Sequence, residues 1–137
     1  MQGGCYCGAV RYELETKPVL KAQCHCRACQ NFSGGAPNLF MAFPAGALRY
    51  VKGQPQQFRK DTPDAVATRE FCATCGTQLA SHRKGMDYVM VKVGTLDDPS
   101  LFGAPKLAIY TAEQQPFHSV PAGVASFAGL PELPKPS

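Results

Sequence analysis

Seven cysteines, gathered in three short segments, are the residues of this chain best suited to chemistry. The segments hold two, three and two thiols in turn: Cys5 and Cys7, then Cys24, Cys26 and Cys29, then Cys72 and Cys75. An odd count leaves one thiol over in any all-disulfide scheme. Residues 1–10 contain neither a basic segment nor a long apolar one, so we expect a reducing, cytoplasmic location, where structural disulfides are uncommon. Metal binding is therefore the leading interpretation.

The outer two segments together predict one closed zinc site with four thiolate ligands: Cys5, Cys7, Cys72 and Cys75. Tetrahedral zinc with bonds of about 2.3 Å needs sulfurs about 3.8 Å apart, which tight turns can supply. Gly8 and Gly76 directly follow a cysteine, and a residue free to take positive φ lets backbone amides turn towards the sulfurs. The alternative for the last pair is a thioredoxin-like redox motif, but a strand-like run rather than a long helix follows it.

The middle segment brings three thiolates within a few residues, at Cys24, Cys26 and Cys29. Three ligands leave one coordination position open, which is typical of catalytic zinc rather than structural zinc. A histidine could instead fill that position: His25, His82 or His118. Strand alternation points His25 away from its neighbouring cysteines, so a solvent-facing or outer role is expected for it. Closure by either of the other two stays open.

Short runs rich in β-branched and aromatic residues must position these thiols. Each lies between glycine or proline residues, and together they predict strands near residues 9–14, 20–24, 39–43, 48–52, 57–60, 67–71, 77–82, 88–93 and 106–110. Val10, Tyr12 and Leu14 alternate with charged residues, as in a strand with one buried face. Helical turns are expected after Cys26 and over residues 97–102. We expect one domain over residues 1–130 and an extended, Pro-rich tail over 131–137.

Bulk composition argues against two classes of partner. The formal net charge is +4 and the calculated pI about 8.7, but the 14 Lys and Arg residues form no block, so nucleic-acid binding is not expected. No apolar run approaches the roughly 20 residues that span a bilayer, so no membrane partner is expected either. The sequence carries no pattern that sets an oligomeric state.

Four stretches carry a resemblance to a known family: residues 3–12, residues 24–29 followed by Gly34, residues 71–77, and residues 93–99. Their cysteines, glycines and spacing resemble the glutathione-dependent formaldehyde-activating enzyme (GFA) family, whose domain is shared with centromere protein V. The stretches cover most of residues 3–130.

The resemblance implies a mainly β, Mss4-like fold of several small curved antiparallel sheets with one or two short helical turns. It also implies two zinc ions: a structural one on Cys5, Cys7, Cys72 and Cys75, and a catalytic or labile one on Cys24, Cys26 and Cys29. The implied activity is that of a carbon–sulfur lyase, whose small-molecule partner is a thiol such as glutathione and whose aldehyde is formaldehyde.

Together with the open zinc site, the resemblance implies an enzyme in which that site delivers a thiolate to an aldehyde. Arg27, Arg59 and Arg69 are candidate partners for substrate carboxylates, with ordinary surface charge as the alternative for each. The alternative function is a non-catalytic, zinc-stabilised binding module. We expect no basic N-terminal extension to serve such a module, because the first cysteine is already residue 5.

Overall fold

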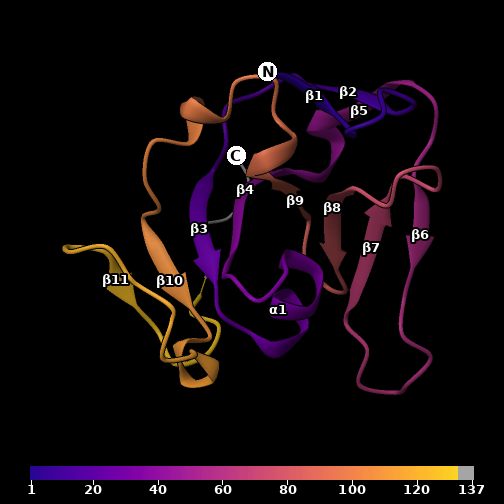
Figure 1. Ribbon diagram of the computed structural model, residues 1–137. Coiled ribbons are helices and arrows are strands. Elements are labelled where there is room, and N and C mark those ends of the chain that lie inside the picture. The colour runs from indigo at the N-terminus through magenta and orange to yellow at the C-terminus, as the bar shows by residue number, and fades with distance from the viewer. Residues whose placement is uncertain (133–137) are drawn as a thin grey trace.

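Short strands separated by turns build two sheets in the computed structural model, which describes residues 1–132 (Figure 1). A three-stranded sheet has the order β1-β2-β5 and an eight-stranded sheet the order β11-β10-β3-β4-β9-β8-β7-β6. The strands are β1 (Gln2–Gly4), β2 (Arg11–Leu14), β3 (Leu20–Cys24), β4 (Asn38–Pro44), β5 (Leu48–Lys52), β6 (Gln56–Phe58), β7 (Ala67–Phe71), β8 (Gln78–Arg83), β9 (Tyr88–Lys92), β10 (Leu107–Ile109) and β11 (Ala125–Ser126). The predicted mainly β fold of several sheets is confirmed.

Most neighbouring strands are antiparallel, but β10 runs parallel to β3 and β11 runs parallel to β10. The arrows of β3 and β10 point the same way in Figure 1. In the register of this pair, Ile109 lies opposite Cys24. Parallel strands end at the same edge of a sheet, so the chain after β10 arrives beside the middle cysteines. This makes the large sheet mixed rather than purely antiparallel.

Each strand predicted from the sequence is present, with ends that differ by a few residues. The sequence did not predict β1 or β11, because both are very short and lack a run of β-branched residues. The predicted helical turn after Cys26 is α1 (Arg27–Ser33), which ends at Gly34 in the left-handed conformation, with φ of 76°. The turn predicted over 97–102 is a 3₁₀ helix at Pro99–Phe102. Further 3₁₀ turns occur at Ala45–Ala47, Val93–Thr95 and Thr111–Glu113.

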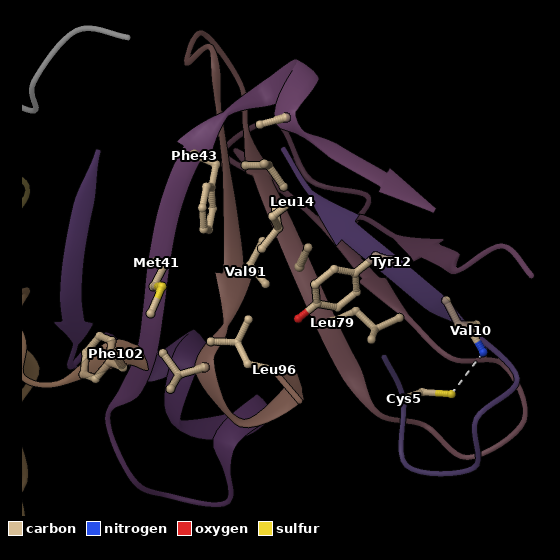
Figure 2. Close-up of a cluster of buried hydrophobic side chains, with 14 of the residues drawn as sticks. Cys5, Val10, Tyr12, Leu14, Met41, Phe43, Leu79, Val91, Leu96 and Phe102 are labelled. Atoms are coloured by element: carbon tan, nitrogen blue, oxygen red, sulfur yellow. Dashed lines mark hydrogen bonds between the residues drawn. The ribbon is translucent and has the colours of Figure 1, made fainter. Parts of the chain in front are cut away.

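The main core lies between the two sheets (Figure 2). Val10, Tyr12 and Leu14 all point into it with at most 4% of their surface exposed, which confirms the predicted alternation. Phe43 and Leu79 of the large sheet are fully buried against them. The core therefore joins the sheets by apolar contact, the dominant favourable contribution to folding.

A second, smaller apolar cluster surrounds the middle cysteines. It contains Leu20, Ala22, Phe40, Ala42 and Ile109 together with Cys24 and Cys29. The middle thiols therefore lie in apolar surroundings. No helix within residues 1–132 is long and apolar enough to cross a membrane. Residues 133–137 of the predicted tail lie outside the described residues, and the single domain over 1–130 stays a prediction.

Candidate functional site

Four thiols from two distant segments meet at one end of the sheets: Cys5, Cys7, Cys72 and Cys75, whose sulfurs all lie within 4.8 Å of one another. The Sγ atoms of Cys5 and Cys7 are 3.6 Å apart, and those of Cys7 and Cys72 are 3.8 Å apart. These distances match the edge of a zinc–thiolate tetrahedron, about 3.8 Å for bonds of about 2.3 Å. The four side chains therefore fit a metal ion of the zinc type.

Backbone amides turn towards these sulfurs. Val10 donates its N–H to Cys5 Sγ at 3.2 Å (Figure 2), and Cys75 donates its N–H to Cys72 Sγ at 3.5 Å. Gly8 and Gly76 have φ of 81° and 78°, so both take the left-handed backbone conformation expected of them. Amide hydrogen bonds stabilise thiolate charge, which favours metal binding by these four residues.

The middle cysteines form a second group that could hold a metal ion, with sulfurs within 4.8 Å of one another: Cys24, Cys26 and Cys29. Cys24 ends β3, while Cys26 caps α1 by accepting the N–H of Cys29 at 3.2 Å. Strand and helix thus meet at the three sulfurs. Within residues 1–132, no His, Asp or Glu side chain joins this group.

The histidines considered as a fourth ligand all bond elsewhere. His25 is fully buried, with Nδ1 3.0 Å from Nδ1 of His118 and Nε2 2.9 Å from the side-chain nitrogen of Gln23. His118 also places Nε2 2.7 Å from the Gly35 carbonyl oxygen, and His82 places Nε2 3.2 Å from the Glu70 carboxylate. Of the two roles expected for His25, the solvent-facing one is wrong, because the segment carrying His118 covers the ring.

The three middle thiols do not ionise alike. Hydrogen bonds from Cys24 and Cys29 hold the pKa of Cys26 far below its usual range. Hydrogen bonds to Cys26 and Cys29, together with burial, raise the pKa of Cys24 instead. Like charges at close range in an apolar setting disfavour one another, so a cation is needed before all three become thiolates.

A cavity of about 260 Å³ opens beside these three cysteines. Apolar side chains form much of its wall: Phe40, Ala42, Val66, Met86, Met90, Ile109 and Leu130. Arg69, Arg83 and Tyr110 add polar groups. Ligand sites in proteins are concave and mostly apolar, with a few placed polar groups. The cavity and the cysteines together are therefore the candidate functional site.

Comparison with known proteins identifies the family. The family model described as "Glutathione-dependent formaldehyde-activating enzyme" matches residues 1–113. The chain belongs to this GFA family. A crystal structure of a Rhodobacter sphaeroides protein shares its fold, with a TM-score of 0.60 and 21% sequence identity. That match covers 93% of this chain and 99% of the other.

In this GFA-family chain, one of the arginines predicted to meet a substrate lies at the cavity. Arg69 lines it, whereas Arg27 bonds to Gln30 of its own helix and Arg59 donates to the Ala65 carbonyl oxygen. Arg83 and Tyr110 also line the cavity, but they were not among the site residues predicted from the sequence. Arg83 and Ser81 are two residues apart, so their side chains lie on the same face of β8. That this face borders the cavity follows only from the pairing of β8 with β7, which the sequence does not give.

Proposed function

We propose that this protein is a carbon–sulfur lyase of the GFA type, acting on adducts of a small glutathione-like thiol with a formaldehyde-like aldehyde. The supporting observation is that three thiols able to hold one metal ion, Cys24, Cys26 and Cys29, lie at a cavity. Three protein ligands with an open position are typical of catalytic zinc, and four are typical of structural zinc. We assign a second, structural zinc to the four-thiolate cluster.

The reaction forms or breaks one carbon–sulfur bond. In the synthetic direction, the thiol sulfur bonds to the aldehyde carbon, the carbonyl electron pair moves to oxygen, and the proton lost by the thiol ends on that oxygen. In the lyase direction, the same bond breaks and releases thiol and aldehyde. Zinc, when bound, lowers the pKa of a thiol and polarises a neighbouring carbonyl.

The chain's own residues would bind, orient and desolvate the reactants. Phe40, Met90 and Ile109 line the cavity beside the thiolates and keep water from the reacting atoms. Positioning a thiol and an aldehyde together removes much of the entropic part of the barrier. The alternative, a non-catalytic zinc-stabilised module, requires no cavity at a metal cluster, so the cavity favours the enzyme.

The test is to add zinc-loaded protein to an equilibrating mixture of thiol and aldehyde and to follow adduct exchange by two-dimensional NMR. We expect exchange faster than the spontaneous reaction, and a return to the spontaneous rate in Cys26→Ser. Arg59→Ala is the matched control, because Arg59 lies outside the cavity wall, and it should accelerate exchange as the unaltered protein does. If adduct exchange in the presence of the zinc-loaded protein stays at the spontaneous rate, both with glutathione and with simpler thiols, the proposed activity is rejected.

A further inference from the structure

The cavity wall carries two arginines on one strand face. In the antiparallel pair β7 and β8, Arg69 lies opposite Ser81 and Ala67 lies opposite Arg83. All four residues line the cavity. Arg69 and Arg83 are therefore diagonal neighbours, and such positions lie about 7–8 Å apart, within reach of each other's long side chains.

Neither guanidinium has an Asp or Glu partner within the described residues 1–132. Arg69 lies over the Phe32 ring, 4.2 Å from its centroid, and Arg83 donates to the Tyr110 hydroxyl at 3.0 Å. The ion pairs found within residues 1–132 involve other residues: Arg11 with Asp97, Arg49 with Glu13 and Glu15, and His82 with Glu70. Two neighbouring, half-buried cations without a carboxylate partner are suited to a ligand that brings one.

The remaining wall sets further limits on that ligand. Most of the cavity wall is apolar and offers few partners for the amide groups of a peptide, and unpaired buried polar groups are unfavourable. Besides the cysteines and the two arginines, the lining residues with polar side chains are Asn38, Ser81 and Tyr110, and Asn38 already accepts a hydrogen bond from Lys92. Among the described residues, no Asp or Glu lines the cavity, so an ammonium group would have no carboxylate partner there. The volume of about 260 Å³ lies just below the range common for drug-sized ligands, about 300–1,000 Å³.

We propose that the cavity binds an apolar thiol that carries one carboxylate and no ammonium group, with the carboxylate held between Arg69 and Arg83. Its sulfur then reaches the open side of Cys24, Cys26 and Cys29, and its hydrocarbon body contacts the apolar wall. The inference rests on the proposed function and narrows its thiol. Glutathione, with two carboxylates, an ammonium group and two peptide bonds, fits this wall poorly.

Binding to the zinc-loaded protein, measured by calorimetry without aldehyde, tests the inference. The probes are 3-mercaptopropionate, its methyl ester, 2-mercaptoethylamine and glutathione. We expect the acid to bind about tenfold or more tightly than each of the other three, as charge-assisted hydrogen bonds predict. An ester or glutathione that binds as tightly as the acid would overturn the proposal.

Variants separate the arginines' contact with the ligand from an effect on the metal. Arg69→Gln and Arg83→Gln should each remove most of the preference for acid over ester, and Arg83→Lys should keep part of it. Arg59→Gln, outside the cavity, should keep all of it. Differences in thiol acidity between the probes affect every variant equally, so they do not change the preference for acid over ester from one variant to the next. An unchanged preference in both glutamine variants, with zinc content also unchanged, would contradict the proposal.

Failure of the ligand assignment can be distinguished from failure of the proposed lyase activity. Tight, arginine-dependent binding of the acid without faster adduct exchange would reject the lyase activity but retain the ligand assignment. Faster exchange with glutathione than with 3-mercaptopropionate would retain the activity and reject the ligand assignment.

Discussion

Cys26 has two structural roles. Its sulfur begins α1 by accepting the N–H of Cys29, and it belongs to the group that could hold a metal ion beside the cavity. Serine is among the best residues for capping a helix in this way. Replacing the sulfur by oxygen therefore removes a soft metal ligand while it keeps the start of the helix.

Cys26→Ser should accordingly lower the zinc content from about two ions per chain to about one, with the fold retained, because only the three-thiolate cluster loses a ligand. Atomic emission gives the metal content, and circular dichroism together with thermal unfolding gives the fold. A variant that still binds two zinc ions would contradict the assignment of the middle cysteines.

Residues were predictable where the signal was local. The spacing of the cysteines and the glycines after Cys7 and Cys75 indicated the turns within each segment, because tight turns bring neighbouring sulfurs together. The meeting of Cys7 with Cys72, 65 positions away in the chain, followed from the four ligands that zinc needs and not from a local pattern. The contact of His25 with His118 joins residues 93 positions apart in the chain, and no local pattern reports it. Arg83 was missed for the same reason, since its place at the cavity depends on strand pairing.

At the scale of elements, Glu70 of β7 links strands from both sheets. Its buried carboxylate accepts hydrogen bonds from Tyr50 of β5 and Gln57 of β6, both at 2.9 Å, and lies 3.2 Å from His82 of β8. Burial alone would raise the pKa of Glu70, but the bonds from these three residues outweigh it and lower the pKa below 4.5. The charged form is therefore favoured in the folded state.

Glu70→Gln should lower the free energy of unfolding by about 2 kcal/mol at pH 7, as expected for hydrogen bonds to a buried charge. A folded pKa below the unfolded one contributes stability above the unfolded pKa, and that contribution is lost as pH falls through the folded pKa. The deficit should therefore shrink below about pH 4.5, the ordinary pKa of this group.

Denaturant unfolding of the unaltered protein and of Glu70→Gln over this pH range measures the deficit. Metal loss at low pH affects both proteins alike and therefore cancels in the difference between them. Glu15→Gln is the control, because that carboxylate is exposed beside Arg49 and should change stability by less than about 1 kcal/mol. A deficit for Glu70→Gln that stays constant with pH would contradict the role of its charge.

The strands with a clear apolar pattern were predicted, whereas β1, β11 and the pairing of the strands were not. Alternation along β2 reports one buried face, which is a property of that strand alone. The short β1 and β11 exist because neighbouring strands offer them hydrogen bonds. The parallel pairing of β10 with β3 depends on a long connection and is invisible in either strand's residues.

At the scale of the molecule, the four-thiolate cluster joins the two sheets. Cys5 and Cys7 follow β1 of the small sheet, and Cys72 and Cys75 lie in the turn between β7 and β8 of the large one. The N–H of Tyr6 adds a bond of 3.1 Å to the Thr77 hydroxyl. A metal ion held there would connect the sheets outside their shared apolar core.

Cys75→Ser should therefore damage the whole fold rather than one site, because structural zinc binding contributes directly to folding free energy. We expect a marked fall in melting temperature and faster hydrogen exchange of the backbone amides in the apolar core. Cys26→Ser is the matched control, because it should keep the fold. A Cys75→Ser protein with native melting temperature and native exchange would count against the structural role of this cluster.

The parallel strand β10 has a consequence for how such proteins can diversify. Ile109, Tyr110 and Leu130 enter the cavity wall from a part of the chain that contains none of the seven cysteines, and Leu130 lies beyond residues 1–113, the span matched by the family model. Part of the cavity wall is thus encoded in a stretch of sequence that holds no metal-binding cysteine. Insertions or exchanges after β9 would therefore change the part of the wall that Ile109, Tyr110 and Leu130 form, without replacing any of the seven cysteines.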